Sequence, residues 1–512
     1  MPINFLIEGD NLAALKLLVK THRGKIDLIY IDPPYNTGNR DFIYNDSYVD
    51  KTDTFRHSKW LSFMKKRLEI AKRLMSDKGV IFISIDDNEQ AALKLLCDDV
   101  LGTDNFAANI AWQRTYSTRN DSKGIVNEVE HILVYSRYIG WQPRKMPRTA
   151  EMDKKYKNPD NDPRGEWRSD NAYAPNAATH QGMVYAIQHP FTGDMLYPTF
   201  SSCWRYEQSD MLEIMNGWCQ YELKDIGDDE KRAEICGVAN VRKGVKAIVL
   251  ARPLEESSRA ATEVLKRGQW PRFFFSKNGK GGIARKTYLD NVGGLPPTNL
   301  WEYKDVGHTD EAKKELMSIF AGKSPFDTPK PVRLLTRILL IASDKESTIL
   351  DFFAGSGTTG HAVMELNAED GGRRKFILVT NNENEICEKV TYERLKRVIA
   401  REKYAAALKY FKVDYVPIGE EGYWDLADKL LGHIRELVEL ENGIDFRHDK
   451  SVAIVLRDEE VAGFVKGLNA GGAHILYKGH NVMLDAKACK AIEKHGVEVR
   501  TIPDYYYPEL EN

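Results

Sequence analysis

Two stretches of the chain alternate short β-branched segments with segments of helical periodicity, and a long stretch without that pattern separates them. Alternation of this kind is typical of a doubly wound, mostly parallel α/β sheet. We expect one sheet, because an insertion between two of its strands accounts for both stretches. The predicted strands are residues 25–31, 80–85, 348–353 and 376–380, and the predicted helices are residues 60–75, 331–342, 360–366 and 391–410.

These patterns divide the 512 residues into four segments. Residues 1–140 and 301–415 carry the two parts of the sheet. Residues 141–300 are rich in Pro, Gly, Asn, Trp and Tyr, and they predict an inserted irregular or β-rich domain. Residues 416–512 predict a smaller α/β unit, in which residues 452–456 form a strand. The residues on or beside one stripe of its predicted helix are Leu426, Leu430, Ile434, Leu437, Val438 and Glu441. That stripe packs within the unit or forms a subunit contact.

Composition narrows the class of protein. The net charge is -2 and the pI is about 6.7, which excludes a histone-like polycation and makes any nucleic-acid surface local. The six cysteines form no C-x-x-C pair and no cluster at zinc-ligand spacing, so we expect no metal site. No run of 18 apolar residues and no signal-peptide pattern occurs. We therefore expect a cytoplasmic protein without a membrane span.

A glycine string, G-x-G-x-x-G from Gly355 to Gly360, lies between a predicted strand and a predicted helix. This context is the one required for a nucleotide-binding loop, and it fits NAD, FAD or S-adenosylmethionine equally well. Glu383 follows the next strand, where a carboxylate can bind ribose hydroxyls, and Glu385 is a neighbouring candidate. A turn needed only for tight packing is the alternative.

A second motif, Asp32-Pro33-Pro34-Tyr35, comes directly after the strand 25–31. The two prolines stiffen the turn and remove two N–H donors, so the turn presents carbonyl oxygens and one carboxylate. A group of acceptors suits a substrate that offers N–H groups, such as the exocyclic amine of a nucleobase. Tyr35 supplies a flat face on which an extruded base can stack. An ordinary turn with an exposed tyrosine is the alternative reading.

The chain resembles the DNA amino-methyltransferases of the β arrangement, in which the D-P-P-Y motif precedes the recognition region and the cofactor motif follows it. Within this group it is most similar to the modification (Mod) subunits of type III restriction-modification systems. The resemblance covers residues 3 to about 400. The segments that carry it are Leu6–Asn11, Asp32–Gly38, Trp60–Leu68, Ile85–Glu89, Glu128–Ser136, Lys330–Pro331 and Asp351–Thr359.

The resemblance implies roles for individual residues. Asp32, Pro33, Pro34 and Tyr35 are expected to hold the target amine. The expected S-adenosylmethionine pocket is formed by the loop that contains Asp351, Phe353, Gly355 and Gly357, with Glu383 at the ribose, Asp10 at the adenine edge, and Lys330 and Pro331 near the methionine end.

Basic residues interleaved with aromatic ones mark a candidate DNA surface. Residues 261–300 contain seven basic and two acidic residues, a local charge of +5, which suits contact with phosphates. The run Phe273–Phe275 itself reads better as a buried strand. The DNA-binding candidates are Arg114, Arg119, Lys123, Lys266, Arg267, Arg272, Lys277, Lys280, Arg285 and Lys286.

These features together predict a site-specific methyltransferase that transfers the methyl group of S-adenosylmethionine to adenine N6 in double-stranded DNA with base flipping. Cytosine N4 is the nearest alternative, because it carries the same exocyclic amine. A non-catalytic DNA-recognition subunit of the same fold and a nicotinamide oxidoreductase are the other hypotheses. The resemblance further implies a homodimer, with the C-terminal unit as the suspected contact, and a separate translocase-nuclease subunit.

Overall fold

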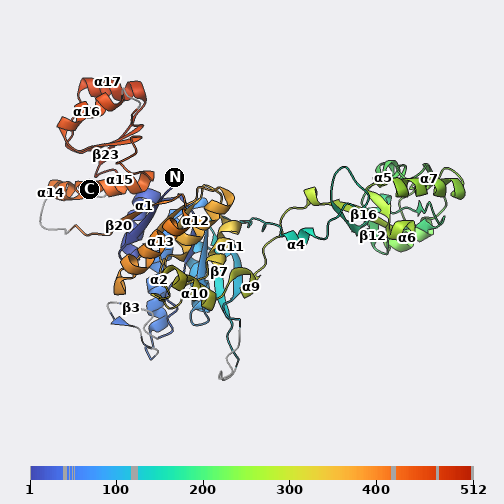
Figure 1. Ribbon diagram of the computed structural model, residues 1–512, viewed down its shortest axis with the longest axis horizontal. Coiled ribbons are helices and arrows are strands. Elements are labelled where there is room, and N and C mark those ends of the chain that lie inside the picture. The colour runs from blue at the N-terminus through green and yellow to red at the C-terminus, as the bar shows by residue number, and fades with distance from the viewer. Residues whose placement is uncertain are drawn as a thin grey trace. The chain divides into compact units, whose positions relative to one another are not determined.

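The computed structural model describes residues 2–38, 43–44, 47–48, 50, 52–116, 125–416, 423–468 and 472–508. The chain forms two compact units, one made of residues 1–144 and 296–512 and the other of residues 145–295 (Figure 1). No helix in the described part of the chain is long and apolar enough to cross a membrane. Within those same residues, no group of three or more His, Cys, Asp or Glu side chains is placed to hold a metal ion.

The first unit is built on a sheet of nine strands in the order β17-β6-β7-β5-β2-β18-β19-β1-β20. β7 runs antiparallel to both of its neighbours, and every other neighbouring pair is parallel. The predicted mostly parallel sheet is confirmed. The strands are β1 (Ile3–Glu8), β2 (Ile26–Ile31), β5 (Met75–Ile85), β6 (Phe106–Gln113), β7 (Val129–Ser136), β17 (Leu300–Trp301), β18 (Thr348–Asp351), β19 (Lys375–Thr380) and β20 (Ala407–Lys412).

The insertion separates two strands that are direct neighbours in the sheet. β2 and β18 pair in parallel, with Leu28 opposite Ile349 and Ile29 opposite Leu350. Because both strands run in the same direction, the residues that follow them meet at one edge of the sheet. The strand before Asp32 and the strand before the glycine string therefore lie side by side in the one sheet that we expected.

Helices cover both faces of this sheet, because its strands are apolar on both sides. On β19, Ile377 and Val379 belong to the core cluster that contains residues of α1, α2 and α3. Phe376 and Leu378 point the other way and lie against Gly360 of α12. The helices on the first face are α1 (Asn11–His22), α2 (Arg56–Leu74) and α3 (Gln90–Leu101). The helices that pack together on the second face are α11 (Val332–Ala342), α12 (Thr358–Asp370) and α13 (Glu393–Glu402).

The predicted long helix over residues 391–410 is wrong. A π-helical turn, Ile386–Tyr392, leads into α13, which ends at Glu402. Lys403 adopts a left-handed conformation with a φ of 56°, which stops the helix. The chain then enters β20, whose pairing with β1 and whose stack of Phe411 on Phe5 decide its conformation. Helical periodicity alone does not include this tertiary pairing.

The C-terminal segment is an α/β unit, but its apolar stripe lies on two helices rather than on one. α14 (Tyr423–Leu431) and α15 (Ile434–Asn442) are separated at Gly432, so the single helix predicted from residue 426 to residue 441 is wrong. Glycine is the weakest helix former after proline, and the chain turns there. The remaining elements are a parallel sheet of β21 (Val452–Val455), β22 (Ile475–Gly479) and β23 (Glu498–Ile502), with α16 (Asp458–Leu468) and α17 (Ala486–His495).

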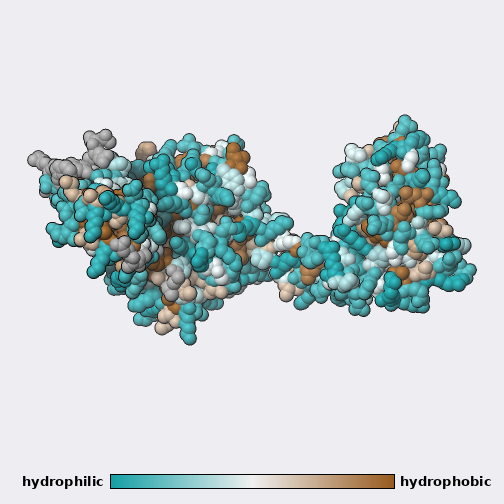
Figure 2. Space-filling model, turned by 90° about the horizontal axis from the view of Figure 1, so that it is seen from above, coloured by the Kyte–Doolittle hydropathy of each residue, from teal (hydrophilic) through white to brown (hydrophobic). Residues whose placement is uncertain are grey.

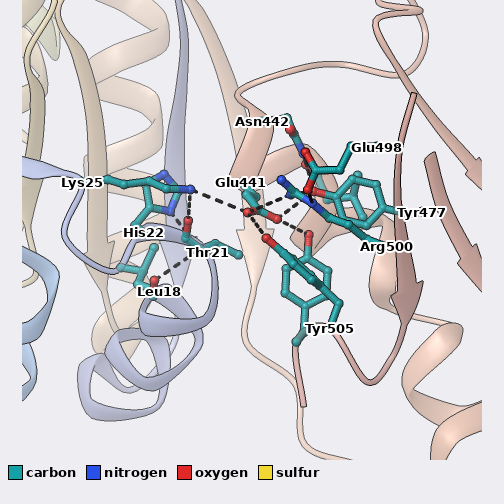
Figure 3. A network of polar contacts seen from close by, with 12 residues as sticks. Leu18, Thr21, His22, Lys25, Glu441, Asn442, Tyr477, Glu498, Arg500 and Tyr505 are labelled. Carbon is teal, nitrogen blue, oxygen red and sulfur yellow. Dashed lines mark hydrogen bonds and ion pairs between the residues drawn. The ribbon is translucent and has the colours of Figure 1, made fainter. Parts of the chain in front are cut away.

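The carboxylate of Glu441 joins the parts of this segment (Figure 3). Its Oε2 atom accepts hydrogen bonds from the hydroxyls of Tyr477, at 2.8 Å, and Tyr506, at 2.7 Å. Arg500 donates to Oε1 at 3.2 Å. Lys25, just after α1, lies 3.6 Å from the same oxygen. Because Glu441 is nearly buried, these donors replace the water that a carboxylate otherwise requires.

The second unit, residues 145–295, has an aromatic core and small sheets. Phe273, Phe274 and Phe275 form β15 and are buried, so the strand interpretation of this run is confirmed. Figure 2 shows mainly hydrophilic residues on the visible surface. The longer elements of the second unit are β8 (Trp167–Asn171), β13 (Tyr221–Lys224), β14 (Ala247–Leu250), β16 (Ile283–Tyr288), α5 (Gln208–Met215), α6 (Asp229–Cys236) and α7 (Leu254–Arg267). The short ones are α4 (Ala150–Asp153), β9 (Tyr173–Pro175), β10 (Ile187–Gln188), β11 (Met195–Leu196), β12 (Ser202–Trp204) and α8 (Ser276–Gly279).

Lys286 lies inside this unit and not on its surface, which corrects its assignment as a DNA contact. Its side chain is fully buried. The ammonium donates to Asp160 and to Asp162, both at 2.5 Å, and to the Trp270 carbonyl at 2.8 Å. All its hydrogen bonds are internal, so Lys286 holds β16 to the segment around Asp160.

We expect Lys286→Met to destabilise the second unit by about 3–5 kcal/mol, because it leaves two buried carboxylates without their cation. Thermal denaturation of the purified protein measures the loss. Lys266→Met is the matched control, since Lys266 is exposed and its ion pair with Glu263 lies in solvent, and we expect it to change stability by less than about 0.5 kcal/mol. Equal stability of the two variants would contradict the structural role of Lys286.

Candidate active site

Four acidic side chains follow four neighbouring strands of the sheet. Asp32 comes after β2, Asp351 ends β18, Glu383 comes after β19 and Asp10 comes after β1. These strands are adjacent and parallel, so all four positions lie at the carboxyl edge. Open α/β sheets bind their ligands at this edge.

Two side-chain hydrogen bonds fix the turn after β2. The indole Nε1 of Trp60 donates to the Pro34 carbonyl at 2.7 Å. Asn36 has a left-handed φ of 56°, and its amide donates to the buried carboxylate of Glu89 at 2.6 Å. Among the described residues no donor contacts the Pro33 carbonyl. The turn is therefore rigid and leaves that carbonyl and Asp32 to face a ligand.

Asp32 contacts a cation and a phenol. The Lys330 ammonium donates to Oδ1 at 2.8 Å and to Oδ2 at 2.7 Å, and the Tyr35 hydroxyl donates to Oδ1 at 2.9 Å. Burial raises the pKa of Asp32, although Lys330 beside it acts in the opposite direction. Burial also acts to lower the pKa of Lys330, but the carboxylates of Asp32 and Glu130 outweigh it and raise the pKa above its ordinary value. The Lys330 ammonium and the Asp32 carboxylate therefore stabilise each other's charged forms.

Glu130 completes this cluster and was not among the predicted site residues. Its Oε2 atom lies 3.0 Å from the Tyr35 hydroxyl and 3.5 Å from the Lys330 ammonium. The single proton of that hydroxyl goes either to Asp32 or to Glu130. Arg114 donates to Oε1 at 3.0 Å. β7 is antiparallel, so its first residues, and not its last, reach the carboxyl edge. The available signal was the segment 128–136, one of the seven that carry the family resemblance.

The glycine string forms the other side of the site. Gly355 and Gly357 have φ values of 50° and 78°, in the left-handed region that favours glycine. Asp351 fixes the start of the loop, because one carboxylate oxygen accepts from the Phe353 amide at 3.0 Å and the other from the Thr359 hydroxyl at 2.6 Å. Gly357 is buried against Thr391, whereas Gly355 is partly exposed at the carboxyl edge and carries no Cβ atom. A backbone without a Cβ atom at this position fits the close approach of a nucleotide-like cofactor.

Two side chains from the π-helical turn and α13 support the same loop, and sequence reasoning missed both. The Thr391 hydroxyl donates to the Gly355 carbonyl at 2.6 Å. The fully buried guanidinium of Arg394 donates to the Ser356 hydroxyl at 3.1 Å and to the Thr358 hydroxyl at 2.8 Å. They lie more than 30 residues after the loop, and no motif marks them. Their contacts explain how the left-handed turns are maintained.

The other predicted cofactor residues lie at the same edge. Glu383 is exposed in a short turn after β19, whereas Glu385 pairs with Lys389. Asp10 caps α1 through the Ala13 amide at 3.0 Å. Pro331 precedes the first residue of α11. Lys330, which we expected beside the methionine end of the cofactor, contacts Asp32.

The DNA-binding candidates fall into three groups. Arg119 and Lys123 lie outside the described residues. Arg272 and Arg285 are partly buried and bind Tyr206 and Asp170 of their own unit, and Arg114 pairs with Glu130 as above. The candidates with exposed side chains in the second unit are Lys266, Arg267, Lys277 and Lys280.

Asp351 gives the site a pH dependence of stability. Burial raises the pKa of Asp351 to about 7, against hydrogen bonds that act to lower it. Between about pH 4 and pH 7 the folded protein therefore binds a proton that the unfolded chain does not, and this group's contribution to the unfolding free energy falls as the pH rises through that range. We expect the stability of Asp351→Asn relative to the wild type to increase from pH 5 to pH 8, by at most about 3 kcal/mol. Denaturation of both proteins across this range tests the prediction, and parallel curves would contradict it.

Comparison with known proteins matches the chain to a family model and to several methyltransferases. The family model described as "DNA methylase" matches residues 26–210 and 251–393. The StyLTI Mod subunit, from a type III restriction-modification enzyme of Salmonella typhimurium, is 34% identical over 434 residues. The type II methyltransferase M.KpnI of Klebsiella pneumoniae is 30% identical over 421 residues, and the EcoPI Mod subunit of Escherichia phage P1 is 30% identical over 427 residues.

The matches cover most of this chain but not all of the larger relatives. They include 78%, 80% and 74% of the chain for these three proteins, in that order. The chain spans 57% of the StyLTI subunit and 58% of the EcoPI subunit, and 90% of M.KpnI. The family model extends over the D-P-P-Y turn and the glycine string. The chain belongs to the DNA methylase family.

Proposed function

We propose that this chain is a site-specific DNA methyltransferase that uses S-adenosylmethionine to methylate adenine N6 in double-stranded DNA. The observation that carries the proposal is the position of Asp32 and the Gly355 loop at the ends of two hydrogen-bonded strands. One element presents acceptors for an amine and the other presents backbone for a cofactor, so the two reacting groups can meet between them.

The chain's residues would act by positioning. The cofactor, when bound, supplies an electrophilic methyl group on a sulfonium. The Asp32 carboxylate and the Pro33 carbonyl each accept one N–H of the target amine, which turns the nitrogen lone pair out of conjugation with the ring. The Tyr35 ring stacks on the extruded base. Asp32 then stabilises the positive charge that develops on nitrogen and accepts its proton late.

Other readings of the site are less well supported. Cytosine N4 offers the same amine, and the three relatives' names leave the base open. A nicotinamide oxidoreductase would use the glycine loop but leaves the cluster of Asp32, Tyr35 and Glu130 without a role. A non-catalytic subunit conflicts with an intact turn and an intact loop.

The proposal extends to partners. The StyLTI and EcoPI relatives are named as Mod subunits of type III enzymes, which supports a separate restriction subunit for this chain. Residues 145–295 are the proposed target-recognition domain and residues 416–512 the proposed dimer contact. A homodimer remains a prediction, and sedimentation equilibrium of the purified chain tests it. The proposed compartment is the bacterial cytoplasm, because the StyLTI and M.KpnI relatives come from bacteria.

Modification-aware sequencing of DNA from a methylation-free bacterial host that expresses the chain tests the function. We expect N6-methyladenine at one short motif, absent from a host that expresses Asp32→Ala. N4-methylcytosine would retain the mechanism and change the substrate. The absence of a mark, from a folded protein that does not bind S-adenosylmethionine, would overturn the proposal.

A further inference from the structure

Lys330 contacts both side chains with which this site would hold a base. Its ammonium donates to the two oxygens of Asp32 at 2.8 and 2.7 Å. It also donates to the Tyr35 hydroxyl at 3.0 Å, at the edge of the ring, 5.1 Å from the ring centre. A base whose amine binds Asp32 needs the carboxylate oxygens that Lys330 contacts. Lys330 therefore competes with the target amine for Asp32.

A second carboxylate lies within reach of the same ammonium. Glu130 Oε2 is 3.5 Å from Lys330 Nζ, slightly beyond a hydrogen bond. Arg114 binds the other oxygen of Glu130 and holds the carboxylate in place. The lysine stem is flexible, with several rotatable bonds. A small rotation of Lys330 can exchange its hydrogen bonds to Asp32 for one to Glu130.

The charges of the cluster favour such an exchange. Asp32 and Glu130 are acidic, Lys330 and Arg114 are basic, and the Lys330 side chain is only 10% exposed. An unpaired ammonium in this setting would be strongly unfavourable. Movement to Glu130 keeps the ammonium paired at every stage, and it leaves Asp32 ionised with both oxygens ready for an amine.

We propose that Lys330 is a positioning residue that occupies Asp32 in the free enzyme and transfers to Glu130 when the target base enters. This inference rests on the proposed methyltransferase function. Glu130 is then needed because Lys330 is present: it accepts the ammonium that the base displaces. The dependence of one residue on the other separates this role from a purely structural one.

A double-mutant cycle tests the exchange. Single-turnover transfer of tritiated methyl groups from S-adenosylmethionine to unmethylated bacterial genomic DNA is measured at pH 8 for wild type, Glu130→Gln, Lys330→Met and the double variant. We expect Glu130→Gln to slow transfer by about 10- to 100-fold, the size of a lost charged hydrogen bond. In the Lys330→Met background we expect the same change to slow transfer by less than about 3-fold, so that the double variant is faster than Glu130→Gln alone.

Two controls make the cycle decisive. Glu128→Gln removes the same charge two residues away, where the side chain contacts Gln113, and we expect near-wild-type transfer. Calorimetric binding of S-adenosylmethionine without DNA should be unchanged in Glu130→Gln and Glu128→Gln, which separates a positioning effect from misfolding. A double variant as slow as Glu130→Gln, or slower, would overturn the exchange. Wild-type protein that transfers no methyl groups would instead refute the proposed function.

Discussion

Asp32→Ala is expected to reduce methyl transfer on the order of 1,000-fold, the scale of loss when a preorganised electrostatic contact to the reacting group is removed. We expect the affinity for S-adenosylmethionine to stay within about 3-fold of wild type. The reason is spatial: Asp32 follows β2, whereas the cofactor loop follows β18 and is fixed by Asp351, Thr391 and Arg394. Single-turnover transfer and calorimetric binding measure the two effects separately.

The Asp32→Ala substitution removes the carboxylate that pairs with the Lys330 ammonium. Without Asp32 the buried ammonium of Lys330 retains Glu130 at 3.5 Å, so the site does not contain an uncompensated cation. Asp32→Asn is the matched control, because it keeps the shape and one acceptor while removing the negative charge. We expect its transfer rate to lie between those of wild type and Asp32→Ala. A large loss of cofactor affinity in either variant would remove Asp32 from its proposed role at the amine.

Local sequence patterns were sufficient to predict the two motifs at strand ends that form this site. The β-branched run before Asp32 and the strand before Gly355 each end in residues with strong conformational demands, two prolines in one case and glycines in the other. Their position at strand ends follows from chain direction alone. The pairing of Leu28 with Ile349, across 320 residues, follows from the resumption of the α/β pattern after the insertion.

The buried residues could not be predicted from local sequence patterns. Glu130 reaches the carboxyl edge only because β7 is antiparallel, and antiparallel pairing of one strand in a parallel sheet leaves no local signal. Lys286 carries the same charge as its exposed neighbours, and only the tertiary contacts with Asp160 and Asp162 show that it is buried. The positions of such residues are decided by tertiary contacts, which composition and spacing do not contain.

Gly355→Val is expected to weaken binding of S-adenosylmethionine by roughly 100-fold or more. The φ of 50° at Gly355 is one that a β-branched residue rarely adopts, at a strain of about 1–3 kcal/mol. The added side chain would also fill the space above an exposed backbone, and Phe326 lies only 3.3 Å from the position of its Cβ atom. Methyl transfer at saturating DNA should fall with cofactor occupancy and recover in part at high cofactor concentration. Calorimetry and a cofactor titration of the transfer rate measure both.

Gly371→Val separates obstruction of the cofactor from backbone strain alone. Gly371, at the end of α12, has a φ of 69°, and no atom lies within 4 Å of the position that its Cβ atom would take. The strain of the substitution is therefore similar, but the site is untouched. We expect Gly371→Val to lower the unfolding temperature while the affinity for S-adenosylmethionine stays near wild type. Equal losses of affinity in the two variants would mean that strain, and not contact with the cofactor, accounts for the effect at Gly355, and the glycine string would then lose its assignment as the cofactor loop.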